Sequence, residues 1–209
     1  GSTDRTGAIV EGLMKKYPFI QLVYHNEPMG IGASYWEGIG KSQGEIVTML
    51  PGDGENDAGE ILQYLPLMEQ VDIVVPFIYN RHARSWTRRI ISKLYKAIIN
   101  ISFRMLLNYT NGNVMYRKCI LQDIALRSKG FFYQTELLIK SLKRGYLYAE
   151  VPSALQHRKS GKSKALSFKS LCRIVRGYLS TIVSVYLFDR KNKQIAPDSI
   201  TAFRYSQLK

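Results

Sequence analysis

The sequence predicts an α/β domain with a mostly parallel sheet flanked by helices. Three observations support this prediction. Strand-like and helix-like segments alternate through the first 80 residues. One strand-like run breaks into a Pro-Gly turn, as strands do at a sheet edge. The chain has 209 residues, 45% of them hydrophobic, which is enough to bury one main core.

The expected elements follow from apolar periodicity and turn residues. Helices are expected over 4–16, 33–42 and 58–69. Strands are expected at the short apolar runs 20–24, 46–50 and 72–76. Alternation at these lengths implies parallel strands joined by crossover helices. The chain begins in a loop and helix cap, so we expect a preceding strand to be missing.

The character of the chain changes after residue 80. Residues 1–80 hold 4 of the 30 Lys and Arg residues and 11 of the 16 Asp and Glu residues, a net charge of −7, and the rest carries +21. A basic half can meet nucleic acid, anionic lipid or a phosphorylated substrate, or can simply be a solvated surface. The sequence contains no nucleic-acid recognition motif, so no nucleic-acid partner is expected.

Two basic amphipathic helices are expected, over residues 85–107 and 167–188. In the first, apolar residues recur at helical spacing at Trp86, Ile90, Leu94, Ile98, Ile101 and Met105. Each helix either packs on the sheet or lies at a membrane interface, which its aromatic residues would suit. Neither has about 18 uncharged apolar residues, so neither is expected to span a bilayer. We expect a cytoplasmic protein, peripheral at a membrane face, with domains over 1–165 and 166–209.

Cys119 and Cys172 show no metal-site spacing and are expected to be reduced, structural thiols. More informative is the stretch MLPGDGEND, from Met49 to Asp57, which follows an apolar run. Its turn presents Asp53 and Glu55 just beyond a predicted strand, where open α/β sheets bind ligands. Asp57 is expected to cap the next helix.

Six stretches together resemble family 2 glycosyltransferases, most closely the dolichyl-phosphate mannose synthase type: GSTDRT, NEPMGIGAS, GEIVTMLPGDGEND, NGNVMYRK, GFFYQTELLIKSLKRGY and EVPSALQHRKSGKSK. Their order and spacing carry the resemblance, which covers about residues 1–188. It implies a GT-A-like fold, a nucleotide-sugar donor, a divalent metal and inversion at the sugar carbon. It also implies a first strand before Gly1, whose acids help to hold the base and ribose.

The resemblance assigns donor-binding roles to Asp4, Asn26, Gly30, Gly32 and Asp53. The family's D-x-D turn holds Mg²⁺ or Mn²⁺, which bridges the donor phosphates. Here the first Asp of that turn is Pro51, and Asp53 and Glu55 are the implied metal ligands.

On the acceptor side, the stretch RKSGKSK resembles a family loop that meets phosphates, which assigns Arg158, Ser163 and Lys164 to phosphate binding. Arg117 is assigned with them. Val114 replaces the arginine that the family has nearby, which weakens the phosphate-acceptor interpretation.

Glu136 and Asp53 are the implied catalytic residues. Glu136 would act as a base toward a sugar hydroxyl, or would only position groups if the acceptor is already an anionic phosphate. The lead hypothesis is sugar transfer to a polyprenyl (dolichyl-type) phosphate at an anionic membrane surface. A saccharide or other lipid-linked acceptor, or a non-catalytic binding role, remain alternatives.

Overall fold

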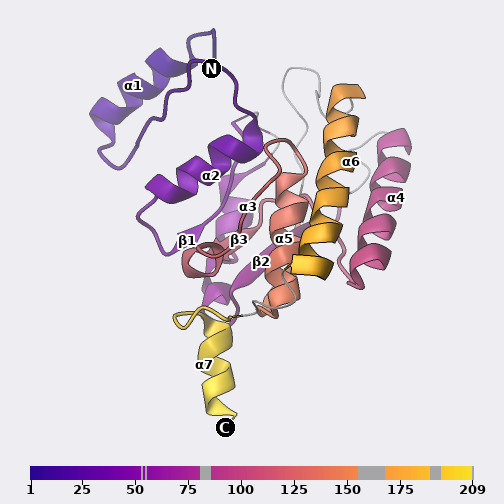
Figure 1. Cartoon of the computed structure of the whole chain (residues 1–209). Coiled ribbons are helices and arrows are strands. Elements are labelled where there is room, and N and C mark those ends of the chain that lie inside the picture. Colours follow the sequence, from indigo (N-terminus) through magenta and orange to yellow (C-terminus); the bar gives the residue numbers. More distant parts are fainter. Residues whose placement is uncertain (53, 55, 81–85, 155–167, 189–193, 209) are drawn as a thin grey trace.

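The computed structural model describes residues 1–52, 54, 56–80, 86–154, 168–188 and 194–208. Helices and strands alternate along the chain, as expected (Figure 1). The elements are α1 (Thr6–Lys16), α2 (Ile31–Lys41), β1 (Ile46–Val47), α3 (Ala58–Leu62), η1 (Leu65–Glu69), β2 (Ile73–Ile78), α4 (Trp86–Phe103), β3 (Met115–Arg117), η3 (Lys118–Leu121), α5 (Tyr133–Arg144), β4 (Tyr148–Ser153), α6 (Phe168–Val183), η4 (Ser184–Phe188) and α7 (Ile200–Gln207).

The sheet has four strands in the order β1-β3-β2-β4. β2 pairs in parallel with β4, whereas β3 is antiparallel to both β1 and β2. β1, β2 and β4 therefore run in one direction, and the reversed β3 lies between β1 and β2. The prediction of an α/β sheet flanked by helices is confirmed, with one reversed strand that the sequence did not reveal.

The two faces of the sheet are covered by different helices. On β2, the side chains of Ile73 and Val75 enter a core with α2 and α5, and Val74 between them enters a smaller core with α3 and η1. This alternation is the two-residue period of a strand buried on both faces. The stacking order is α3 and η1, then the sheet, then α2 and α5.

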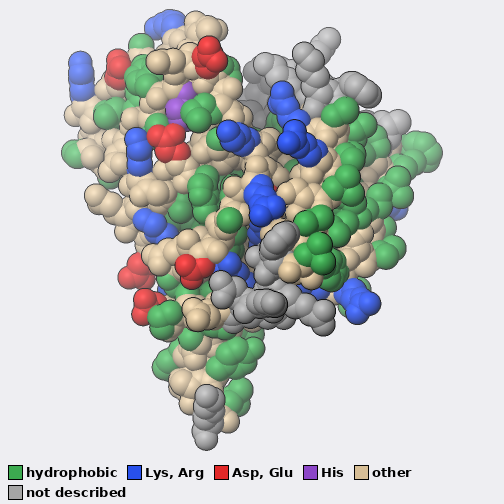
Figure 2. Space-filling view, viewed as in Figure 1, with side chains coloured by type: hydrophobic (Ala, Val, Ile, Leu, Met, Phe, Trp, Pro, Cys, Tyr) green, Lys and Arg blue, Asp and Glu red, His purple; other side chains and the backbone are tan. Residues whose placement is uncertain are grey.

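α4 and α6 form an outer layer beyond α5. Their inner faces and η4 share a core with α5, built around Ile99, Phe103, Ile139 and Val185. Their outer faces are apolar and exposed, and Figure 2 shows hydrophobic side chains gathered over this layer at the right of the view. Within the described residues, none of the helices combines the length and the apolar character needed to cross a membrane.

The helix expected over 85–107 ends at Phe103, and the one expected over 167–188 changes to a π-helix after Val183. Three other elements differ more from the sequence expectations. Residues 20–24 are not a strand, because they join no ladder with another strand among the described residues. The expected strand 46–50 forms pairs only over Ile46–Val47. The expected helix 58–69 is split into α3 and a 3₁₀ turn with Pro66 near its start, because proline cannot donate the backbone hydrogen bond that would continue a helix.

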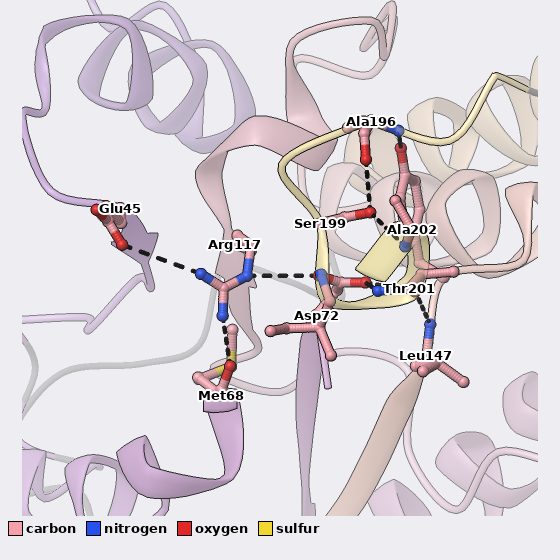
Figure 3. A network of polar contacts seen from close by, with 11 residues as sticks. Glu45, Met68, Asp72, Arg117, Leu147, Ala196, Ser199, Thr201 and Ala202 are labelled. Atoms are coloured by element: carbon pink, nitrogen blue, oxygen red, sulfur yellow. Dashed lines mark hydrogen bonds and ion pairs between the residues drawn. The ribbon is translucent and has the colours of Figure 1, made fainter. Parts of the chain in front are cut away.

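The C-terminal part of the chain is tied to the sheet through Asp72, directly before β2 (Figure 3). Its buried carboxylate accepts hydrogen bonds from the backbone N–H groups of Ile200 (2.8 Å) and Thr201 (2.9 Å) and from the Thr201 hydroxyl. The carboxylate thus lies at the N-terminus of α7, where backbone N–H groups are otherwise unpaired. Described residues after 167, including Ile174 and Ile195, pack against the same cores as α5. The expected division at residue 165 lies outside the described residues and stays a prediction.

Candidate functional site

A cleft of about 160 Å³ lies at one edge of the sheet. Its lining comes from the carboxyl ends of β1, β2 and β4, the segment before β3 and the start of α5. The lining residues are Ile31, Met49, Pro51, Asn56, Ile61, Pro76, Ile78, Tyr109, Asn111, Gly112, Asn113, Phe131, Tyr133, Gln134 and Ser153. Three parallel strands end here, and this is where open α/β sheets bind ligands.

The glycine pair Gly30 and Gly32 lets the start of α2 approach the loop before α5. Gly30 has φ of 95°, and a Cβ there would lie 2.5 Å from the Lys129 carbonyl oxygen. A Cβ on Gly32 would lie 2.5 Å from the Ser128 carbonyl oxygen, and the Gly32 N–H donates to the Lys129 carbonyl at 2.9 Å. Any side chain at either position would separate α2 from this loop.

Glu136 supports the same loop from the other side. One carboxylate oxygen accepts from the Arg127 N–H (3.0 Å) and pairs with the Lys140 ammonium (2.7 Å), and the other accepts from the Ser128 N–H (2.8 Å). Both charged side chains are buried. Because both oxygens are occupied and solvent is excluded, the geometry favours a positioning role for Glu136 over that of a base.

Two residues that line the cleft each carry a buried polar atom without a partner. The Asn113 side-chain nitrogen and the Tyr133 hydroxyl have no hydrogen-bond partner among the described residues. A buried polar group left unpaired costs about 1–3 kcal/mol, so such groups in a cleft are suited to bind a ligand or ordered water. The sequence analysis missed both. The signal available was an NGN turn directly before an apolar run.

A smaller hollow of about 10 Å³ shares Tyr133 with the cleft, and Tyr35 and Tyr116 are also among its lining residues. Burial raises the pKa of Tyr35, Tyr116 and Tyr133 well above the usual tyrosine value, so all three stay neutral at physiological pH. They act as rigid apolar support, and the rings of Tyr35 and Tyr133 are 5.0 Å apart.

The structure corrects the expected role of Arg117. Because β3 is antiparallel, its carboxyl end lies at the opposite edge of the sheet from the cleft. The Arg117 side chain contacts Asp72 (3.4 Å), Glu45 (4.0 Å) and the Met68 carbonyl oxygen (Figure 3). Its charge is therefore used to pair the carboxylate of Asp72, and it does not meet a phosphate in the cleft.

Comparison with known proteins identifies the family. The sequence pattern described as Glycosyl transferase family 2 matches residues 1–125, more than half of the chain. The chain belongs to glycosyltransferase family 2. It is 27% identical over 181 residues to a polyprenol monophosphomannose synthase of Mycolicibacterium smegmatis, over 78% of this chain and 67% of that relative.

Solved structures support the fold of this family 2 chain. Glucosyl-3-phosphoglycerate synthase from Mycobacterium tuberculosis, in complex with Mg²⁺ and UDP, matches with a TM-score of 0.58 and 18% identity. Its complex with Mn²⁺, UDP-glucose and phosphoglyceric acid matches with a TM-score of 0.57 and 19% identity. Each match covers 88% of this chain and 65% of the solved chain. The GT-A-like fold expected from the sequence is confirmed.

Asp4 and Asn26, two other residues expected to bind the donor of this glycosyltransferase, are exposed. Both precede Ile31 in the sequence, and Ile31 lines the cleft. Asp4 begins the turn into α1, and hydrogen bonds from Thr6 hold the pKa of its carboxyl below the usual value. Asn26 lies in a bend between α1 and α2. Their donor-binding roles stay predictions. Asp57 caps α3 by accepting from the Gly59 N–H at 2.7 Å, as expected.

Several implied site residues lie outside the described residues, namely Asp53, Glu55, Arg158, Ser163 and Lys164. Pro51 and Asn56, which bracket the two acids in sequence, line the cleft. Within the described ranges no group of three His, Cys, Asp or Glu side chains could hold a metal. The described lining does offer neutral oxygen donors from Asn and Ser side chains, the hard ligands that Mg²⁺ and Mn²⁺ accept alongside carboxylates.

Proposed function

We propose that this chain is the catalytic domain of an inverting glycosyltransferase that moves a sugar from a nucleotide-sugar donor to a polyprenyl-type lipid phosphate at a membrane surface. Membership of family 2 and the named relative support sugar transfer. The observation that carries the membrane part is the exposed apolar outer face of α4 and α6, in a chain whose sheet-edge cleft suits the donor.

The donor would occupy the cleft between the 51–56 turn and the start of α5. Asp53 and Glu55 would hold Mg²⁺ or Mn²⁺ there, as metal and UDP-glucose are bound in the solved glucosyl-3-phosphoglycerate synthase. Such a metal neutralises the negative charge on the departing nucleoside diphosphate. Asn113 and Tyr133 line the cleft, and a small rearrangement on binding would let their unpaired polar atoms meet the donor. The Glu136 carboxylate keeps the loop beside α2 in place.

The outer face supports docking on lipid. On α4 the exposed apolar residues recur at helical spacing, at Trp86, Ile90, Leu94, Ile98 and Ile101. On α6 they do the same, at Leu171, Val175, Leu179 and Val183. Apolar patches of this extent are rare on surfaces that only face water, and basic residues beside them favour an anionic interface (Figure 2).

A soluble phosphorylated acceptor is the second candidate function. One solved family relative of similar fold is a complex with phosphoglyceric acid, and the apolar face is then left without a role. The two functions differ in where transferred sugar appears, which an extraction assay separates.

The test incubates the protein with Mn²⁺, labelled UDP-glucose or GDP-mannose, and phosphatidylcholine vesicles that contain phosphatidylglycerol and undecaprenyl phosphate. We expect label in the lipid extract, and vesicle binding at low salt. Asp53→Ala should abolish Mn²⁺-dependent donor binding, whereas Asp57→Ala should only weaken a helix cap, by about 1 kcal/mol. Equal donor binding by Asp53→Ala and the parent would contradict the metal assignment.

The membrane part has its own variants. Leu94→Ser with Leu179→Ser removes two half-inserted side chains and should lower vesicle partition at least tenfold, because burying one leucine contributes about 1.5–3 kcal/mol. Phe203→Ser on α7 removes a similarly exposed apolar side chain, at 59% against 61% for Leu94 and 55% for Leu179, and should leave partition unchanged. Phosphoglyceric acid can be added to the same incubation as a competing acceptor. Labelled sugar found only on phosphoglyceric acid would favour the soluble acceptor.

A further inference from the structure

The chain between α4 and β3 forms one wall of the cleft and is held at three places. At its start, the Asn108 backbone N–H and side-chain amide donate to the Glu150 carboxylate on β4, at 2.7 and 3.0 Å. Near its end, a Cβ on Gly112 would lie 2.6 Å from the Pro76 carbonyl oxygen of β2, so the backbone passes close to the sheet. Between these points Asn111 lines the cleft, and its side chain is held from α5.

Three side chains connect this wall to the outer layer of helices. The Thr135 hydroxyl on α5 is buried and lies 2.5 Å from the Asn111 side-chain oxygen and 2.8 Å from the Tyr95 hydroxyl on α4. The Thr110 carbonyl oxygen lies 3.3 Å from the same hydroxyl. Because α5 lies between α4 and the sheet, Thr135 can meet both the outer helix and the cleft wall (Figure 1).

The hydrogen bonds in this group have one consistent direction. An amide oxygen and a carbonyl oxygen can only accept, so the single Thr135 proton goes to one of them, and the Asn111 oxygen is the nearer. The Tyr95 hydroxyl must then donate to the Thr135 oxygen. Burial raises the pKa of Tyr95 to about 12, although hydrogen bonds with Thr135 and Asn111 oppose this rise, so the proton is present at physiological pH. Since each bond polarises the next, losing the Tyr95 hydroxyl weakens the hold on Asn111.

Fixing the Asn111 oxygen decides which group Asn111 can offer to a ligand. The oxygen accepts from Thr135, so the amide nitrogen remains as the donor at the cleft. Within the part of the chain that the structure describes, the lining residues of the cleft are all neutral. Neutral amides and hydroxyls match the hydroxyl groups of a sugar, whereas a phosphate is bound more strongly by charged donors.

We propose that Tyr95 and Thr135 are positioning residues for the donor, because they fix the side chain of Asn111, whose amide N–H donates to a hydroxyl of the sugar in the cleft. The inference rests on the proposed function and deepens it by naming what one wall of the donor site recognises. Neither Tyr95 nor Thr135 lines the cleft, so both act through Asn111. The helix with the exposed apolar outer face thus holds a cleft residue from its inner face.

The test compares two variants that each remove one tyrosine hydroxyl bonded between helices. Tyr95→Phe removes the hydroxyl that supports Thr135. Tyr178→Phe is the control, because it removes an α6 hydroxyl that lies 2.6 Å from the Ser102 hydroxyl on α4, and neither of these residues lines the cleft. Isothermal titration calorimetry with Mn²⁺ measures binding of UDP-glucose and UDP to the 209-residue protein, with GDP-mannose and GDP as a second pair.

Tyr95→Phe should weaken binding of the sugar nucleotide about fivefold and leave binding of the nucleoside diphosphate unchanged, whereas Tyr178→Phe should change neither. Asn111→Ala should cause the same selective loss. Adding Tyr95→Phe to Asn111→Ala should cause no further loss, because the hydroxyl acts through Asn111. Additive losses in the double variant would overturn the positioning role.

Hydrogen exchange followed by mass spectrometry gives a second readout that needs no ligand. Exchange of the backbone amides of residues 109–112 should be faster in Tyr95→Phe than in Tyr178→Phe, and equal rates would overturn the link from Tyr95 to the cleft wall. An unchanged ratio of sugar-nucleotide to diphosphate affinity in Tyr95→Phe would overturn the inference while the proposed function stands. A parent protein that binds neither sugar nucleotide would overturn the proposed function, and the sugar assignment with it.

Discussion

Replacing Glu136 by glutamine should lower the stability of the protein, because Glu136 holds the loop beside the cleft, and should not only slow a reaction. The side chains of Glu136 and Lys140 are 1% and 4% exposed and 2.7 Å apart. Glutamine keeps the size but leaves the lysine ammonium buried without its counter-charge, which costs about 3–5 kcal/mol in such pairs. The lower end applies here, because Lys140 also donates to the Ala125 carbonyl oxygen at 2.7 Å.

The expected loss is therefore about 3 kcal/mol in the free energy of unfolding, or about 6–12 °C in Tm for a chain of this length. Urea titration followed by circular dichroism measures it. Lys140→Met should destabilise by a similar amount, and the double variant should lose clearly less than the sum of the two, because neither charge is then left alone. A Glu136→Gln protein with the parent's urea midpoint and no transfer activity would refute this reasoning and restore the role of base.

Two further predictions concern packing and reactivity. Gly32→Ala should lower the free energy of unfolding by about 1–3 kcal/mol in urea titration, because its Cβ would lie 2.5 Å from a carbonyl oxygen. Gly38→Ala on the same helix is the control: its Cβ meets nothing within 4 Å, so it should stabilise the protein slightly. Equal effects of the two substitutions would contradict the close approach at Gly32. Iodoacetamide at pH 8 should alkylate Cys172 faster than Cys119, as followed by mass spectrometry, because burial raises the pKa of the Cys119 thiol while Cys172 is exposed. Faster alkylation of Cys119 would be inconsistent with this burial.

The helices of the first 80 residues could be predicted because each carries its own apolar periodicity, but strand pairing could not. The run 20–24 is rich in strand-forming residues, yet it forms no ladder among the described residues. A strand exists only with a neighbour, and composition does not name the neighbour. The antiparallel direction of β3 could not be predicted for the same reason, because the sequence of a three-residue strand does not indicate its direction relative to its neighbours.

The direction of β3 also explains what was missed at the site. Motif order predicted the family and its fold, because the motifs depend on local turns and spacing. The donor-binding role expected of Gly30 and Gly32 stays a prediction. Motif order could not place Arg117, whose distance from the cleft follows from the reversed strand. It also could not show that Glu136 is enclosed, because burial depends on the loop at Arg127 and Ser128 that folds over it.

The same carboxylate network that holds α7 has a consequence for how the chain is made. Asp72 belongs to the first half of the sequence, and the backbone donors that satisfy it lie 128 and 129 positions later, at Ile200 and Thr201. During synthesis β2 leaves the ribosome long before these donors exist, so its amino end carries a carboxylate that cannot yet be buried without a large penalty. Arg117 can pair the carboxylate once β3 has been made, but its backbone hydrogen bonds form only after residues 200 and 201 have left the ribosome.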